Sequence, residues 1–199
     1  KIAIKGAKFM AVIGAILGDI AGSQFEFNRP ENLDYKHCEL FTSRCSYTDD
    51  TIMTLAVKKA ILENADFTKT MREVGQPYPY SGYGGRFYEW MYGENPKPYN
   101  SFGNGSAMRV SFIGEHFDAL EDVVSMAEKS AEVTHNHPEG IKGAVVTAVC
   151  IWMARHGKTK EDIFQYVLEQ YPAEKYEYSI AVPLDELEKI YQWNETCMG

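Results

Sequence analysis

The sequence predicts an all-α fold, a bundle of about six helices or more. Apolar residues recur at helical spacing along most of the chain, and segments with strand-like alternation are nearly absent. The composition supports one domain, because 45% hydrophobic and 24% charged residues in a chain of 199 are typical of a globular protein with a sizeable core.

The predicted helices are defined by their apolar spacing and by residues that start or stop a helix. The first, over residues 10–22, carries three glycines four residues apart on one face, which favours close helix packing. The most apolar helix spans residues 138–156, with Pro138 in its first turn and Gly157 at its end. Further helices are expected at residues 49–63, 118–131, 160–171 and 183–193.

The segment of residues 75–105 does not fit this pattern, because glycine, proline and aromatic residues crowd together in it. A long, weakly periodic segment inside a compact domain is usually functional or disordered. It holds nine aromatic residues, and leaving so many in water is unfavourable. We therefore expect an ordered binding loop, with a short helix over residues 84–92 and with Phe87 and Trp90 packed in the core.

The net charge and the cysteine spacing limit the classes of protein to which this chain could belong. A net charge of −8 argues against general binding to nucleic acids or anionic lipid, since both need a basic surface. No two of the four cysteines have C-x-x-C spacing, which favours reduced thiols in a cytoplasmic protein. No apolar run is long enough to span a membrane.

The first residues allow two interpretations. The stretch K-I-A-I-K-G-A-K before F-M-A-V-I-G-A-I-L resembles the basic and apolar regions of a signal peptide. Its apolar run is short, Asp19 interrupts it, and no convincing A-x-A cleavage site follows. We favour a single domain over residues 10–199, with residues 1–9 as a non-native or disordered extension. Because the chain stops at Gly199 without closing an element, we expect this domain to be incomplete.

Residues 46–51 read S-Y-T-D-D-T and precede an apolar helical run. Ser46 or Thr48 could cap that helix, with Asp49 and Asp50 at its positive end. A cap needs one oxygen, however, and this stretch offers five or six hard oxygens. Adjacent carboxylates repel unless a proton or a cation intervenes, and such a cluster suits Mg²⁺, Mn²⁺ or Ca²⁺ rather than zinc or copper. Both interpretations stay open from these residues alone.

Four motifs in order resemble those of the ADP-ribosylglycohydrolase family. The first two are G-A-I-L-G-D-I-A-G-S-Q-F-E at residues 14–26 and T-D-D-T at residues 48–51. F-G-N-G-S-A-M-R follows at residues 102–109, and T-H-N-H-P-E-G-I-K-G-A at residues 134–144. T-D-D-T alone is weak, but four ordered motifs are specific. The resemblance implies a compact, orthogonal all-α bundle.

The resemblance also implies a site for two Mg²⁺ ions and ADP-ribose. Glu26, Asp49 and Asp50 would be catalytic, with Glu26 acting as a metal ligand or as base to the attacking water. Thr48 would join these three as a metal ligand. The substrate-binding residues would be Gly84, Gly103, Asn104, Gly105, Ser106, Met108 and His135.

The implied reaction is Mg²⁺-dependent hydrolysis of the N- or O-glycosidic bond that links ADP-ribose to a protein side chain or small conjugate. It passes through an oxocarbenium-like state and needs an oriented water. Backbone N–H groups of residues 103–106, at a helix start and helped by the helix dipole, would bind the diphosphate. Aromatic residues within 78–102 could stack on adenine. The alternative is a catalytically silent relative that binds ADP-ribose or has a structural role.

The chain departs from the family pattern in one respect. Family members carry a D-x-D-T motif near the C-terminus that completes the two-metal site, and this sequence has none. We therefore expect the bundle to lack its last helices, the second metal site to be incomplete and the fragment to be poorly active.

Smaller questions concern the third and fourth motifs. A zinc pair of His135 and His137 is disfavoured, because no cysteine or third histidine stands near. Asn136 is expected to cap the helix that begins at Pro138, leaving His135 to face the pocket. Arg109 is expected to form a structural ion pair.

Overall fold

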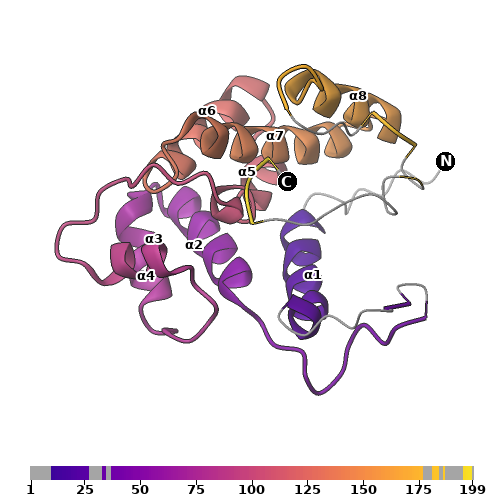
Figure 1. The fold of residues 1–199 in the computed structure, drawn as a ribbon. Helices are drawn as coiled ribbons and strands as arrows, with labels where there is room; N and C mark the ends of the chain where they lie inside the picture. Colours follow the sequence, from indigo (N-terminus) through magenta and orange to yellow (C-terminus); the bar gives the residue numbers. More distant parts are fainter. Residues whose placement is uncertain are drawn as a thin grey trace.

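The computed structural model describes residues 10–26, 33–34, 37–176, 181–183, 186 and 195–198, and all regular structure in them is helical (Figure 1). The α-helices of this part are α1 (Met10–Glu26), α2 (Asp49–Glu63), α3 (Phe67–Gly75), α4 (Gly85–Tyr92), α5 (Ser111–His116), α6 (Leu120–Glu132), α7 (Pro138–Arg155) and α8 (Lys160–Gln170). A 3₁₀ turn, η2 (Asn104–Ser106), precedes α5. The predicted all-α fold class is confirmed. None of the described helices is long and apolar enough to cross a membrane.

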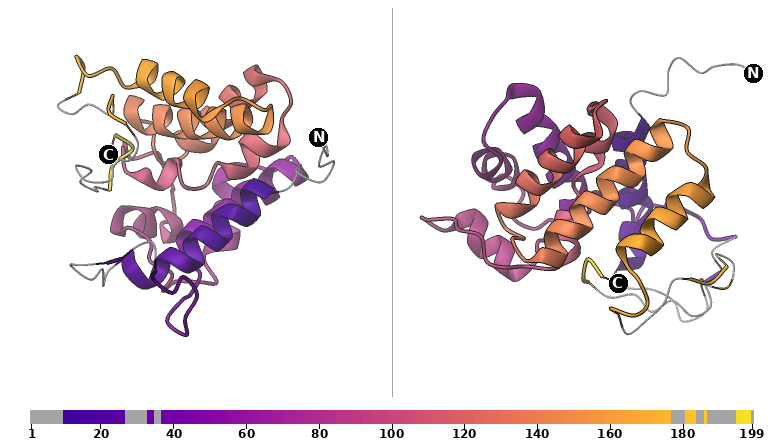
Figure 2. Two further views of the ribbon diagram at one scale, coloured as in Figure 1. Left: turned by 90° about the vertical axis from the view of Figure 1, so that its right-hand side faces the viewer. Right: turned by 90° about the horizontal axis from the view of Figure 1, so that it is seen from above.

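Helix α7 is central to the packing, since it contacts α5, α6 and α8. Figure 1 shows α6, α7 and α8 in the upper part of the molecule and α2, α3 and α4 below them. Helix α1 packs on α2 and α5 and runs across the direction of α7 (Figures 1 and 2). One buried cluster joins α2 to α7, with members such as Met53, Met71, Met91, Ile113, Val123 and Ala148.

The long periodic helices agree with the sequence prediction to within a few residues. The predicted short helix within residues 75–105 is α4. Helices α3 and α5 were not predicted, although α3 has a clear start: the Asp66 side chain accepts a hydrogen bond from the Lys69 N–H at 2.7 Å. Residues 1–9 lie outside the described part of the chain, as does most of the predicted helix over residues 183–193.

The predicted cap of α7 is wrong by one residue. The His137 ring accepts the Glu139 N–H through Nδ1 at 3.1 Å, so His137 is the N-cap. The Asn136 side chain instead accepts the Asn100 N–H at 2.7 Å. Asn136 thereby fastens the loop before η2 to the start of α7.

The glycine face of α1 is open in the described structure. A Cβ added at Gly14, Gly18 or Gly22 would meet nothing within 4 Å, so the predicted close packing on this face is not found among the described residues. The close approach occurs at Gly114 in α5, where a Cβ would lie 2.4 Å from the Ala148 carbonyl oxygen of α7.

These two surroundings predict opposite effects of the same substitution. Gly114→Ala should lower the free energy of unfolding by about 1–3 kcal/mol, because the added methyl overlaps the backbone of α7. Gly14→Ala is the matched control and should raise it by about 0.5–1 kcal/mol, because an exposed helical glycine is replaced by a better helix former. Urea titrations of both variants test this. Similar effects at the two positions would contradict the packing described.

Candidate active site

A cavity of about 490 Å³ opens between the start of α2, the loop before α4 and the segment around η2. Its volume is in the range of small-molecule sites. Thr48 and Ser106 are not among its lining residues. Nine of the eleven predicted site residues do line it: Glu26, Asp49, Asp50, Gly84, Gly103, Asn104, Gly105, Met108 and His135.

Asp19 of α1 fixes the position of the T-D-D-T stretch. Its Oδ1 accepts the Thr48 hydroxyl at 2.6 Å. Its Oδ2 accepts the Thr48 N–H at 2.8 Å, the Thr51 N–H at 3.2 Å and the Thr51 hydroxyl at 2.5 Å. This carboxylate fastens α1 to the first turn of α2. Sequence reasoning assigned Asp19 no role; the available signal was an acid within an apolar run.

The capping interpretation of T-D-D-T is confirmed for Thr48, whose hydroxyl oxygen accepts the Asp50 N–H at 3.3 Å. This cap makes no use of the carboxylates of Asp49 and Asp50, and both residues line the cavity. Capping and a role at the cavity are therefore compatible, because different side chains carry them.

The cavity-lining carboxylates of Glu26, Asp49 and Asp50 all have raised pKa values. Burial raises the pKa of Asp49 to about 7, and the negative charges of Asp50, Glu26 and Asp19 add to that rise. Burial and the charge of Asp19 also raise the pKa of Asp50. The pKa of Glu26 is raised by burial and by the charges of Asp50, Asp19 and Glu195. A cation bound here would relieve this repulsion.

The donor atoms suit a hard divalent cation such as Mg²⁺. Thr48 Oγ1 and Asp50 Oδ2 lie 3.3 Å apart, near the separation of about 3 Å between neighbouring ligands in an octahedral Mg²⁺ shell. Thr48 donates its proton to Asp19 and accepts one N–H, which leaves one lone pair for a ligand. Yet no three acidic, histidine or cysteine side chains of the described residues are grouped as a metal site would require. These residues therefore fit the ion by their chemistry but form only part of a site.

The G-N-G-S stretch forms a single 3₁₀ turn instead of the predicted helix start. A turn of three residues has too few aligned peptides for the predicted dipole contribution. The Gly103 N–H donates to Ser101 Oγ at 3.2 Å, and the Asn104 N–H donates to the Glu195 carbonyl at 2.9 Å. Two of the N–H groups predicted to bind diphosphate are thus engaged within the protein.

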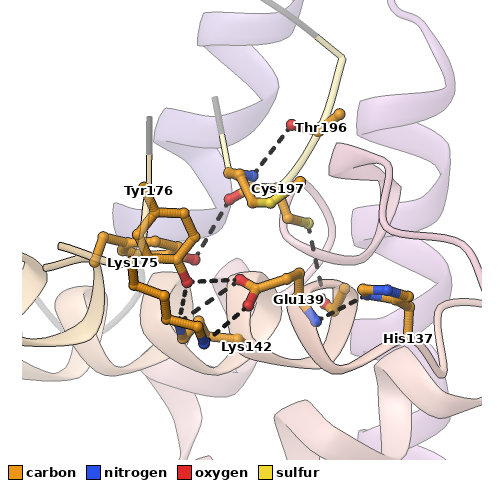
Figure 3. Close-up of polar contacts among 10 residues, drawn as sticks. His137, Glu139, Lys142, Lys175, Tyr176, Thr196 and Cys197 are labelled. Atoms are coloured by element: carbon orange, nitrogen blue, oxygen red, sulfur yellow. Dashed lines mark hydrogen bonds and ion pairs between the residues drawn. The ribbon is translucent and has the colours of Figure 1, made fainter. Parts of the chain in front are cut away.

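Thr196 forms a β-bridge with Gly103 beside this turn, and Figure 3 shows Thr196 and Cys197 above the part of α7 that carries Glu139. The Cys197 N–H donates to the Phe102 carbonyl at 2.9 Å, and its thiol donates to the Gly103 carbonyl at 3.1 Å. The glycine at 143 makes this possible, since a Cβ there would lie 2.5 Å from the Cys197 sulfur. The turn is therefore held by a segment more than 90 residues further along the chain, of which Glu195 itself lines the cavity.

Ser106 also supports the turn from behind. Its hydroxyl donates to the Gly140 carbonyl at 2.7 Å, and the residue is completely buried. The structure thus places this predicted substrate-binding residue behind the cavity wall, where it fastens η2 to α7.

Glu139 belongs to a network that ties the segment after α8 to the first turn of α7 (Figure 3). Its carboxylate lies 3.6 Å from Lys142 Nζ and 3.3 Å from Lys175 Nζ, and it accepts the Tyr176 hydroxyl at 2.9 Å. Burial raises the pKa of Glu139, but the Tyr176 hydrogen bond and the two lysines outweigh burial and lower it. Glu139, an acid in the first turn of α7, is therefore part of an ion-pair cluster.

The cavity also has aromatic and cationic lining. Arg86 lies over the Tyr99 ring, 4.8 Å from its centroid, and both residues line the cavity. Tyr99 is one of the aromatic residues within 78–102 that were expected to offer stacking surface, whereas Arg86 belongs to no motif and was missed. Trp90 is buried in the core, as predicted, whereas Phe87 stacks on Trp90 and also lines the cavity.

His135 and Arg109 complete this part of the cavity. Burial, followed by the charges of Arg109 and Arg86, lowers the pKa of His135 to about 3, so its ring is neutral near pH 7. Arg109 is fully buried, and burial lowers its pKa to about 10. The expected ion pair of Arg109 is not found: no carboxylate of the described residues pairs with its guanidinium.

The fold and the cavity define an all-α protein with a cavity whose lining combines clustered carboxylates, a glycine-rich turn, the exposed Arg86 and the buried Arg109. A model of the ADP-ribosylglycohydrolase family matches residues 6–197. The chain belongs to this family.

Individual relatives agree with that assignment. The human and mouse proteins named ADP-ribosylhydrolase ARH3 are each 30% identical to this chain over 183 residues, which covers 76% of the chain and 50% of each relative. The protein of the same name from Xenopus tropicalis is 26% identical over 183 residues, covering 77% of this chain and 52% of the relative. The chain thus spans about half the length of the curated relatives it matches.

The raised pKa of Asp49 predicts how stability depends on pH in EDTA. Because the folded pKa of about 7 lies above the unfolded value of 3.8, this group's contribution to stability is complete below pH 4 and is lost as the pH rises through 7. Asp49→Asn should therefore raise the free energy of unfolding at pH 8, by up to about 2 kcal/mol after allowance for partial exposure, and change it little at pH 4. Denaturant titrations at both pH values measure this.

Asp162→Asn is the matched control, because the pKa of Asp162 is lowered by its hydrogen bonds to Thr159 in the capping box of α8. It should lower stability at pH 8, the opposite sign. Destabilisation of the Asp49 variant at pH 8 would show that its carboxylate is not under repulsion.

Proposed function

We propose that the protein, in its full-length form, hydrolyses the glycosidic bond between ADP-ribose and a protein side chain or small conjugate, and that it depends on Mg²⁺. One observation carries the proposal: the carboxylates of Glu26, Asp49 and Asp50 share one cavity with the G-N-G turn and His135. The names of the relatives, which describe ADP-ribosyl hydrolysis, support the substrate class.

The residues that would hold Mg²⁺ are Asp49, Asp50, Glu26 and Thr48. When bound, the ion would supply a positive centre that orients ribose hydroxyls and water and offsets changing charge at the reacting carbon. The mutually repelling carboxylates favour such an ion, because its charge replaces three sources of repulsion with attraction. The chain contains no D-x-D-T motif, so the remaining ligands of a two-ion site would come from sequence beyond these 199 residues.

Side chains of this protein would accept the proton and bind the adenine and the diphosphate. Glu26 lies at the end of α1 and lines the cavity, so its carboxylate is placed to accept a proton from an attacking water. Tyr99 and Phe87 offer aromatic surface for the adenine base. Arg86 at the rim is a cation for the diphosphate.

The test is release of ADP-ribose from peptides modified on arginine or serine, with Mg²⁺ or with EDTA. The full-length protein should release ADP-ribose only with Mg²⁺, and this chain alone should be slow and bind Mg²⁺ weakly. Glu26→Gln should lower kcat about 100-fold or more if the carboxylate takes a proton in the rate-limiting step. Asp50→Asn should raise the Mg²⁺ concentration needed for half-maximal rate at least about tenfold.

Asp122→Asn, in the exposed first turn of α6, is the control and should leave both quantities unchanged. Release of ADP-ribose at the same rate in EDTA would show that the reaction does not depend on a metal ion. Binding of ADP-ribose without release by the full-length protein would favour the catalytically silent relative instead.

A further inference from the structure

Arg109 is a buried cation without an anionic partner in the described part of the chain. Its Nη2 donates to the Ser130 carbonyl and, at 3.0 Å, to Thr134 Oγ1. Its Nε and Nη1 are buried and have no hydrogen-bond partner among the described residues. Burying an unpaired charge is strongly unfavourable, so the arrangement calls for an explanation beyond packing.

Thr134 connects this cation to His135. The Thr134 hydroxyl oxygen lies 3.0 Å from Arg109 Nη2 and 2.7 Å from His135 Nδ1, and all three residues are buried. A guanidinium only donates, so Thr134 must accept from Arg109. Its single proton then has one described acceptor, His135 Nδ1.

This order of donors fixes the state of the imidazole. A neutral histidine carries one proton, and if Nδ1 accepts, the proton is on Nε2. The ring stays neutral because burial and the nearby arginines lower its pKa to about 3. Its backbone is held as well, since the His135 N–H donates to the Ala131 carbonyl at 2.7 Å.

The Nε2 edge of the ring faces the glycine-rich turn. A Cβ at Gly105 would lie 3.1 Å from Nε2, and one at Gly103 would lie 3.8 Å away. These glycines keep space open in front of the ring, and His135 lines the cavity. No hydrogen bond joins Nε2 to another described residue, so its N–H remains available to a ligand.

We propose that Arg109 and Thr134 are positioning residues that hold His135 as its Nε2–H tautomer, so that the cavity presents a fixed, neutral donor to an anionic oxygen of the ligand. For the ligand, taken to be the diphosphate of ADP-ribose, this inference rests on the proposed function. The buried charge of Arg109 adds a positive potential behind the donor, which supports an anion in a protein of net charge −8.

The tautomer is measured directly, without ligand, on the chain labelled with ¹⁵N-histidine. Long-range ¹H–¹⁵N spectra distinguish a protonated Nε2 from a protonated Nδ1, and loss of signals in His135→Asn assigns the ring. We expect wild-type His135 to be neutral and protonated on Nε2 from pH 5 to 8. Thr134→Ser keeps the hydroxyl and should keep this pattern, whereas the near-isosteric Thr134→Val should shift the Nδ1 resonance to that of a nitrogen without a donor.

Binding of ADP-ribose by calorimetry provides the second readout. Thr134→Val should weaken binding about tenfold or more, as expected when a hydrogen bond to a charged group is lost, and Thr134→Ser should stay within about twofold of wild type. Thermal melting of both variants shows whether they fold. If the valine variant does not fold, the wild-type tautomer and the serine variant still decide the question.

Several outcomes would overturn the inference: a wild-type ring protonated on Nδ1, a ring that is positively charged at pH 6, or a serine variant that binds as poorly as a folded valine variant. Failure of the proposed function gives a different result. Wild-type protein that does not bind ADP-ribose would reject that ligand, while the ligand-free spectrum still tests the relay from Arg109 to His135.

Discussion

The acidic wall of the cavity depends on one carboxylate, that of Asp19. It accepts two backbone N–H groups and two hydroxyls from the start of α2, and so joins α1 to α2. With α2 begun at this point, Asp49 and Asp50 emerge from its first turn toward Glu26 at the end of α1. The hydroxyl oxygen of the capping residue Thr48 is also a possible ligand for a cation. The helix cap therefore orders the same residues that would bind the ion.

The cavity lining contains two groups of charged residues. Besides burial, the charges of Asp50 and Glu26 raise the pKa of Asp49, whereas those of Arg109 and Arg86 lower the pKa of His135. The proposed ligand carries its charge on the diphosphate and its reactive carbon on the ribose, so two separate charge clusters would give it a preferred direction. The acids repel one another while no cation is bound, and this repulsion lowers the stability of the folded protein.

The sequence was sufficient to predict the helices with regular apolar spacing and most of the site residues that lie within motifs. Helices α2, α6, α7 and α8 have several turns of apolar spacing, which a single sequence displays well. Helices α3 and α5 have nine residues or fewer, too short for the spacing to stand out. The roles of Asp19 and Arg86 were missed because they depend on contacts across the fold, although Asp19 lies within the first motif. The engagement of the Asn104 N–H was beyond prediction for the same reason, since its acceptor lies 91 residues away at Glu195.

The open face of α1 has a consequence for how the chain behaves in solution. Beside its uncovered glycines, Met10, Ile13 and Leu17 are each about half exposed or more, at 62%, 49% and 48%. An exposed apolar strip on a helix favours association between molecules. Electrostatic repulsion between molecules of net charge −8 opposes that association. Dissolved salt screens the repulsion and leaves the apolar attraction intact. We therefore expect molecules of this chain to associate more readily as the ionic strength rises.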